Sequence, residues 1–73
     1  MDAVELMDRL AERGCSVVLK ADGERPPGLR WMVIASGGAL GEDGSFRTDR
    51  PSPEACLNAL LEHLEGRNLF PFA

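Results

Sequence analysis

Both ends of this 73-residue chain carry an amphipathic helical segment, and each apolar stripe must be buried against whatever lies between the two. The first segment, residues 2–13, starts at the N-capping residue Asp2 and is followed by Gly14, a residue typical of helix ends. The second, residues 53–65, follows Ser52 as N-cap, and we expect Gly66 to end it. The stripes are Ala3, Leu6, Met7, Leu10 and Ala11 in the first segment, and Cys56, Leu57, Leu60, Leu61 and Leu64 in the second.

Three strands are expected between these helices, at residues 15–20, 29–36 and 45–48, where β-branched and aromatic side chains gather. Turn residues fill the first connection, and residues 37–44 predict a flexible second turn with Glu42, Asp43 and Gly44 at its tip. Short connections favour antiparallel pairing. We therefore expect one α+β domain over residues 1–66, in the order α-β-β-β-α. Both helices should pack on one face of a three-stranded antiparallel sheet.

The side chains of the expected strands alternate between the two faces of the sheet, and this alternation places apolar residues on the face without helices. An antiparallel sheet covered on one face normally places polar side chains on the other. If Trp31 and Val33 face the helices, then Val18, Met32 and Ile34 face outward and form an apolar strip. Two occupants remain open: the apolar tail at residues 67–73, with Phe70 and Phe72, or another protein. A second copy of the chain, giving a dimer, is one form of the latter.

The balance of acidic and basic residues indicates which classes of partner the chain can bind. Eight basic and twelve acidic residues give a net charge of −4, and Lys20 is the only lysine. Phosphate binding needs a basic face, so we expect neither nucleic acid nor an anionic membrane as partner. Arg30, Arg47 and Arg50 are expected to pair with neighbouring acids. Glu42 and Asp43 are candidates for an acidic contact surface toward a basic protein. No signal peptide or membrane-length apolar run is visible, which favours the cytoplasm.

Candidate chemistry in the sequence is sparse. His63, the only histidine, has no predicted orienting acid, so we interpret it as a surface residue on a solvated face. Cys15 and Cys56 lie in apolar segments and are predicted to be buried thiols, with one disulfide between them as the alternative. No close ligand pair indicates a metal site. The glycines of residues 37–44 lack the Lys-Ser/Thr pair of phosphate-binding loops. We predict no catalytic residue, metal or cofactor.

Two resemblances follow from these residues. The element order is similar to that of the double-stranded RNA-binding fold, whose last helix begins with a basic cluster. Here that place is Ser52-Pro53-Glu54-Ala55, so the resemblance covers topology and not function. The second half of the chain, with Trp31, Gly37-Gly38 and residues 49–55, also resembles small phage and prophage accessory proteins with an α-β-sheet-α sandwich. That resemblance implies a non-enzymatic accessory or inhibitory protein.

The expected function is accordingly a non-enzymatic protein-interaction module. A small acidic inhibitor from a phage or mobile element, of the anti-CRISPR kind, is one concrete form. The predicted partner-binding residues are Val18, Met32, Ile34, Glu42, Asp43, Phe70 and Phe72. The alternative is a small thiol-dependent enzyme or redox protein that uses Cys15 or Cys56, and thiol accessibility separates the two hypotheses.

Overall fold

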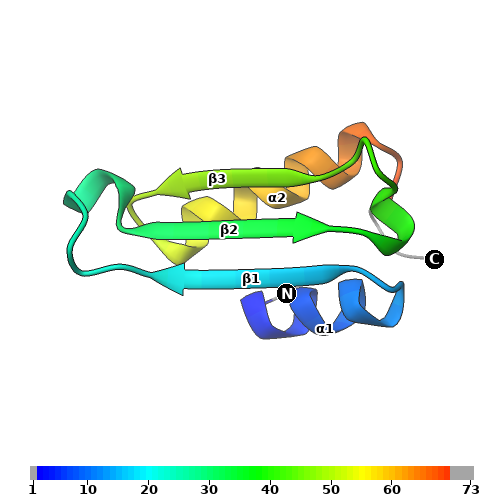
Figure 1. Ribbon diagram of the computed structural model, residues 1–73, viewed down its shortest axis with the longest axis horizontal. Coiled ribbons are helices and arrows are strands. Elements are labelled where there is room, and N and C mark those ends of the chain that lie inside the picture. Colours follow the sequence, from blue (N-terminus) through cyan, green and yellow to red (C-terminus); the bar gives the residue numbers. More distant parts are fainter. Residues whose placement is uncertain (1, 70–73) are drawn as a thin grey trace.

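The computed structural model of the chain describes residues 2–69 and confirms the predicted α-β-β-β-α order (Figure 1). Phe70 and Phe72 lie outside the described residues. The predicted start of the second strand was two residues early, and the third strand extends two residues further than predicted. The elements are α1 (Ala3–Glu12), β1 (Ser16–Ala21), β2 (Trp31–Ser36), β3 (Phe46–Arg50) and α2 (Pro53–Gly66), with single 3₁₀ turns η1 (Pro27–Leu29) and η2 (Gly38–Leu40).

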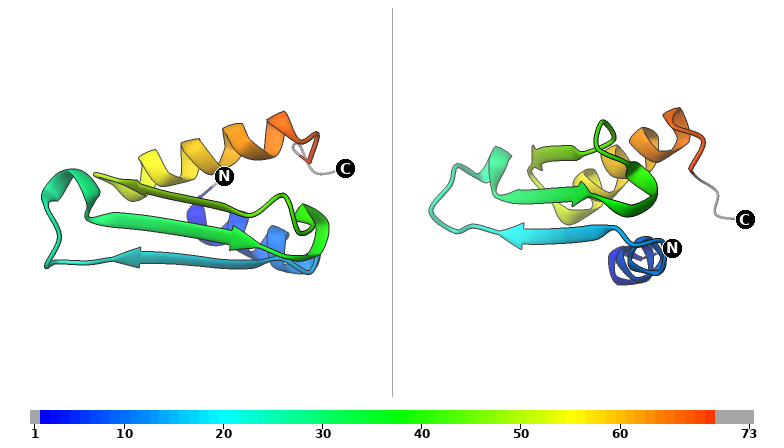
Figure 2. Two further views of the ribbon diagram at one scale, coloured as in Figure 1. Left: turned by 45° about the horizontal axis from the view of Figure 1, so that its top comes forward. Right: turned by 45° about the vertical axis from the view of Figure 1, so that its right-hand side comes forward.

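The sheet has the order β1-β2-β3, and both pairs of strands are antiparallel. Both helices lie on the same face of this sheet: α2 lies behind β2 and β3, and α1 lies beyond the outer edge of β1 (Figures 1 and 2). The register places Val33 opposite Leu19 on β1 and opposite Thr48 on β3, so these three side chains face the helices. Among residues 2–69, no helix lies on the opposite face of the sheet.

The helix starts confirm the predicted caps, because Asp2 and Ser52 accept hydrogen bonds from the backbone N–H groups of Glu5 (2.7 Å) and Ala55 (3.1 Å). At the end of α1, Gly14 has a φ of 80° and its N–H bonds the carbonyl of Ala11. This is a Schellman ending, which satisfies carbonyls that the last turn leaves free.

The helix α2 ends at Gly66, as predicted, but this glycine does not take the left-handed position that follows the helix. Gly66 is the last helical residue, and the left-handed position is taken by Asn68, with a φ of 60°. The N–H of Asn68 bonds the carbonyl of Glu65, and the N–H of Leu69 bonds that of Leu64 at 2.8 Å. Asparagine tolerates the left-handed region better than most residues. The helix therefore ends at Gly66, and the left-handed turn at Asn68 directs Leu69 back onto the core.

Replacing Gly66 with alanine is expected to raise the free energy of unfolding by about 0.5–1 kcal/mol. The position is helical, its φ is negative and an added Cβ meets nothing within 4 Å. Urea denaturation followed by circular dichroism measures the change. Gly41→Ala is the matched comparison, because Gly41 also has open space but a φ of 70°, and that variant should lose stability. A destabilised Gly66→Ala variant would contradict the helical ending described above.

The core lies between the sheet and the two helices. As predicted, both apolar stripes contribute to it, together with the helix-facing side of β2. Leu40 was not predicted as a core residue, yet it is only 1% exposed. The fully or almost fully buried apolar residues are Leu6, Leu10, Cys15, Val33, Ala35, Leu40, Cys56, Leu60 and Leu64.

The glycine-rich connection between β2 and β3 is a packed element, so its prediction as a flexible turn was wrong. Its single 3₁₀ turn places Leu40 in the core, and the N–H of Ala39 bonds the carbonyl of Arg13 at 3.0 Å. Gly38 lies so close to the end of α1 that a Cβ would collide with the backbone of Gly14. Gly44 is buried against the Leu40 carbonyl and is not at a tip.

Candidate functional site: the open face of the sheet

The side of the sheet that faces away from the helices gathers three of the predicted site residues. Val18 lies opposite Ile34 across β1 and β2, and Met32 is the next outward residue of β2. Val18 is 51% exposed, whereas Met32 and Ile34 are half-buried because strands flank them on both sides. We call these three residues the apolar strip. Charged residues flank the apolar strip across the strands. Arg47 on β3 is the neighbour of Ile34, and Met32 lies between Lys20 on β1 and Asp49 on β3.

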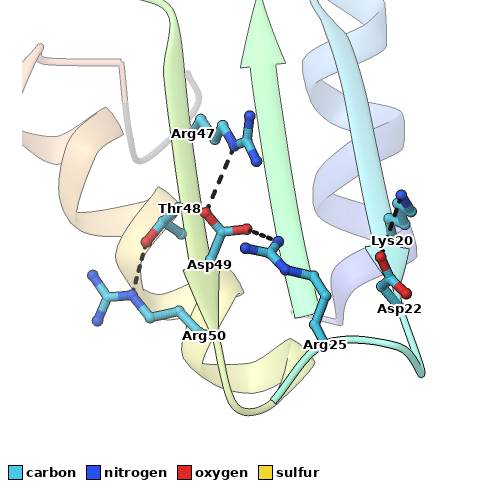
Figure 3. Close-up of polar contacts among 7 residues, drawn as sticks. All are labelled: Lys20, Asp22, Arg25, Arg47, Thr48, Asp49 and Arg50. Carbon is cyan, nitrogen blue, oxygen red and sulfur yellow. Dashed lines mark hydrogen bonds and ion pairs between the residues drawn. The ribbon is translucent and has the colours of Figure 1, made fainter. Parts of the chain in front are cut away.

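An ion-pair network borders one end of the apolar strip (Figure 3). Arg25 reaches from the connection between β1 and β2 to Asp49, with 2.6 Å between Nη1 and Oδ1. Arg47 approaches the other carboxylate oxygen of Asp49 at 3.6 Å, and Lys20 lies 3.8 Å from Asp22. Two cations share the Asp49 carboxylate, so this border keeps an excess of positive charge. We call the apolar strip and this border together the open face.

Sequence reasoning missed the roles of Asp49 and Arg25. The third strand was predicted to stop at Thr48, which left Asp49 in a loop, but β3 continues to Arg50. Extending the two-residue alternation from Arg47 places Asp49 on the same side of the sheet. Nothing local signals that Arg25 reaches β3, since 24 residues separate it from Asp49.

The hydrogen bond from Arg25, followed by the charges of Arg25 and Arg47, holds the pKa of Asp49 below its ordinary value of 3.8. A pKa that is lower in the folded state stabilises the fold above the unfolded pKa. We expect Asp49→Asn to lower the urea midpoint at pH 7. The penalty should persist down to about pH 4 and vanish as pH falls through the folded pKa. It should also shrink in an Arg25→Gln background. A penalty independent of pH would contradict this account.

Of the other predicted site residues, Glu42 and Asp43 are not on the open face, and Phe70 and Phe72 lie outside the described residues. Glu42 and Asp43 belong to the connection between β2 and β3, which lies at the opposite end of the sheet from the connection between β1 and β2 that holds Arg25 (Figure 1). Leu69, the described part of the apolar tail, packs against the core on the helix side. The open face thus brings together Val18, Met32 and Ile34 but not the predicted acids.

His63 is not the solvated surface residue that we predicted. Its ring stacks on Phe46 with centroids 4.7 Å apart, and its Nε2–H donates to the carbonyl of Gly44 at 2.8 Å. A ring in this position links α2 to the start of β3. His63 therefore helps to fix the glycine-rich connection against the second helix.

The two cysteines are free thiols and are buried, as predicted. Burial raises the pKa of the Cys56 thiol above its ordinary value of 9.0, and a backbone hydrogen bond from Arg50 offsets only part of that effect. A thiol that is 0% exposed and protonated at neutral pH is a poor nucleophile.

Two further concave surfaces lie near the starts of the two helices. The larger is an open hollow of about 270 Å³, lined by Asp2, Ala3, Pro53, Glu54 and Leu57. The smaller is a cleft that is almost entirely apolar, and its cavity volume is only about 10 Å³, roughly one water molecule. Small-molecule sites occupy several hundred cubic ångströms, so this cleft holds no ligand in the described conformation. It is lined by Ala3, Leu6, Met7, Val17, Leu19, Val33, Pro53, Leu57 and Leu60.

Charge is divided unevenly between the two layers. Residues 2–13 and 52–67, which form the helices and their caps, hold seven acidic and three basic residues. Residues 14–51, which form the sheet and its connections, hold five of each. The whole net charge of −4 therefore belongs to the helical layer, and the sheet layer is neutral.

No protein-family model, curated protein or solved structure matches this chain. Among residues 2–69, no helix is long and apolar enough to cross a membrane. The functional argument therefore depends on the geometry of the open face alone.

Proposed function

We propose that this chain is a non-enzymatic protein-interaction module that binds a larger protein through its open face. The observation that carries the proposal is the apolar strip on a helix-free face, where a 51% exposed valine adjoins two half-buried apolar side chains. Exposed apolar surface bordered by charge is typical of protein contact sites.

The apolar strip and the charged border of the open face would contribute to binding in different ways. Burial of Val18, Met32 and Ile34 would supply most of the affinity, because a few apolar anchors dominate binding energies. Lys20, Arg25 and Arg47 would orient the partner and discriminate against wrong ones, since border charges act mainly on encounter and specificity. An inhibitor from a phage or mobile element that occludes a surface of its target is one form of such a module.

The proposal is tested with the double variant Met32→Thr/Ile34→Thr. Threonine keeps β propensity while it removes apolar surface from the strip. The tagged chain and the variant are used to recover partners from cells of the source organism, with quantitative mass spectrometry of the recovered proteins. We expect the specific partner to fall by at least about tenfold, the cost of losing roughly 1.4 kcal/mol of anchor burial.

Val4→Thr is the matched control, because Val4 is 76% exposed on the helical side of the molecule. It makes the same kind of change without touching the open face, so recovery of the partner should be unchanged. Equal recovery with the double variant and the wild type would overturn the proposal. Turnover of a substrate by the purified chain would also overturn it.

A thiol-dependent enzyme remains the second class of function, and the burial of both cysteines disfavours it. We expect the folded chain to react with a thiol reagent at least about a hundredfold more slowly than the unfolded chain, because labelling must wait for local opening. Stopped-flow absorbance at pH 8, with and without denaturant, measures both rates. Rapid labelling of Cys15 or Cys56 in the folded chain would favour the redox alternative.

A further inference from the structure

The size of the open face indicates that a partner must also contact its surroundings. Strands of six residues are about 20 Å long, and three strands with a spacing of about 4.8 Å span roughly 15 Å. The resulting area of about 300 Å² is well below the roughly 800 Å² that each side of a stable interface buries. Two sheet edges adjoin the open face, and the strands β1 and β3 form them.

The hydrogen-bond pattern shows which backbone groups the β1 edge presents. The N–H of Asp22 bonds the carbonyl of Arg30 at 2.8 Å, and these residues are the next pair in the register of β1 and β2. Successive residues of an antiparallel strand direct their backbone groups to opposite sides. Even-numbered residues of β1 therefore bond β2. The N–H and C=O groups of Val17, Leu19 and Ala21 point away from β2, toward the free edge.

The two edges differ in how well they resist pairing. β3 has charged side chains at three of its five positions, and Pro51 follows it directly. Charges and proline are devices that block edge pairing. β1 has one charged residue in six, Lys20, contains no proline and pairs with β2 without a bulge. β1 is therefore the edge without these protections. Its residue Val18, whose side chain lies on the open face, belongs to the apolar strip.

The side chains around this edge define the chemistry of a suitable segment. A strand laid along β1 would place its side chains beside Val18 and Lys20 on the open face, where cross-strand neighbours interact. An apolar residue of the added strand fits beside Val18, and an acidic residue fits beside Lys20. Around this end of the sheet, the four cations Lys20, Arg25, Arg30 and Arg47 outnumber the three acids Asp22, Glu24 and Asp49.

We propose that the free edge of β1 accepts an extended acidic segment of a partner protein as a fourth strand. This inference rests on the proposed function, because it names the part of the partner that lies beside the open face. The main-chain hydrogen bonds to Val17, Leu19 and Ala21 supply affinity, and the side chains beside Val18 and Lys20 supply specificity.

The test is selection of a randomised twelve-residue peptide library, displayed on phage, against the full chain. Enrichment of peptides that alternate Asp or Glu with apolar residues is expected. Enrichment of Lys-rich peptides, or no enrichment over an empty support, would overturn the proposal. Charge reversal in Lys20→Glu should shift the selected residues from acidic to basic.

Ala21→Pro separates edge pairing from other modes of binding. Proline there removes an outward N–H without removing a hydrogen bond to β2, and edge strands tolerate it. We expect the selected peptides to bind this variant at least about tenfold more weakly, whereas Ala21→Val, which keeps the N–H, binds them normally. Binding that is insensitive to Ala21→Pro would overturn the edge inference.

The same peptides distinguish this inference from the proposed function. Peptides that lose affinity for Met32→Thr/Ile34→Thr but not for Ala21→Pro would leave the open face as the binding surface and remove the edge. The reverse result would retain the edge and remove the apolar strip. Light scattering of the chain alone measures its molar mass, and so shows whether a second copy of the chain occupies the β1 edge. A dimer that Ala21→Pro dissociates would overturn the assignment to an acidic partner.

Discussion

The Gly38→Ala variant is expected to lose most of its stability. An added Cβ would collide with the backbone of Gly14 and Arg13, and the φ of 50° at this position already disfavours a side chain. The colliding atoms are main chain and cannot rotate away, so the end of α1 must separate from η2. We expect a loss of at least about 3 kcal/mol. A domain of this length has roughly 4–11 kcal/mol in total.

Urea denaturation of Gly38→Ala, followed by circular dichroism, measures this loss. Gly28→Ala is the control, because Gly28 also lies in a connection, has a negative φ and meets nothing within 4 Å. That variant should stay within about 0.5 kcal/mol of the wild type. If both variants were equally stable, the contact between the glycine-rich connection and α1 would be refuted.

The Leu40→Ala variant is expected to lose about 2–5 kcal/mol, the usual cost of emptying a buried leucine site. Leu40 is 1% exposed and belongs to the same core cluster as Leu10 and Leu64. The loss should lie in the upper part of that range. Gly38 already packs against the backbone of Gly14, and Gly44 packs against the backbone of Leu40, so the surrounding chain has little room to fill the cavity.

Thermal unfolding of Leu40→Ala is compared with that of Leu29→Ala. Leu29 belongs to the other single 3₁₀ turn but is 44% exposed, so the same truncation should cost less than about 1 kcal/mol there. Similar melting temperatures for the two variants would show that Leu40 is not a core residue. The glycine-rich connection would then be the flexible turn that the sequence suggests.

Local signals explain why most of the fold was predictable. The apolar periodicity and the caps at Asp2 and Ser52 specify both helices without reference to the rest of the chain. The order of the strands then followed from short connections. The end of α2 at Gly66 was predicted, but the left-handed residue is Asn68, and the contact of Leu69 with the core favours this later position.

The packed connection was not predictable, because its structure depends on residues distant in sequence. Four glycines in eight residues usually indicate a flexible loop. Here Gly38 meets the end of α1, and the carbonyl of Gly44 meets His63, which is 19 residues away. The role of His63 was missed for the same reason, since only the folded chain brings Phe46 against its ring.

The candidate site was predicted in part. The apolar strip follows from the alternation of β1 and β2, because Val18, Met32 and Ile34 have the wrong polarity for a solvated face. Its charged border does not follow, since Arg25 joins Asp49 only when the first connection folds over the sheet. The acids that were predicted as a contact surface, Glu42 and Asp43, lie at the other end of the molecule.

The open face as the binding surface is tested most directly by site-specific photo-crosslinking in cells of the source organism. A photoreactive amino acid replaces Ile34 in one variant and Val4, on the helical side, in a second. We predict a discrete covalent adduct with one partner protein from position 34 and none from position 4. An adduct from position 4 alone would place the interface on the helical layer and contradict the account.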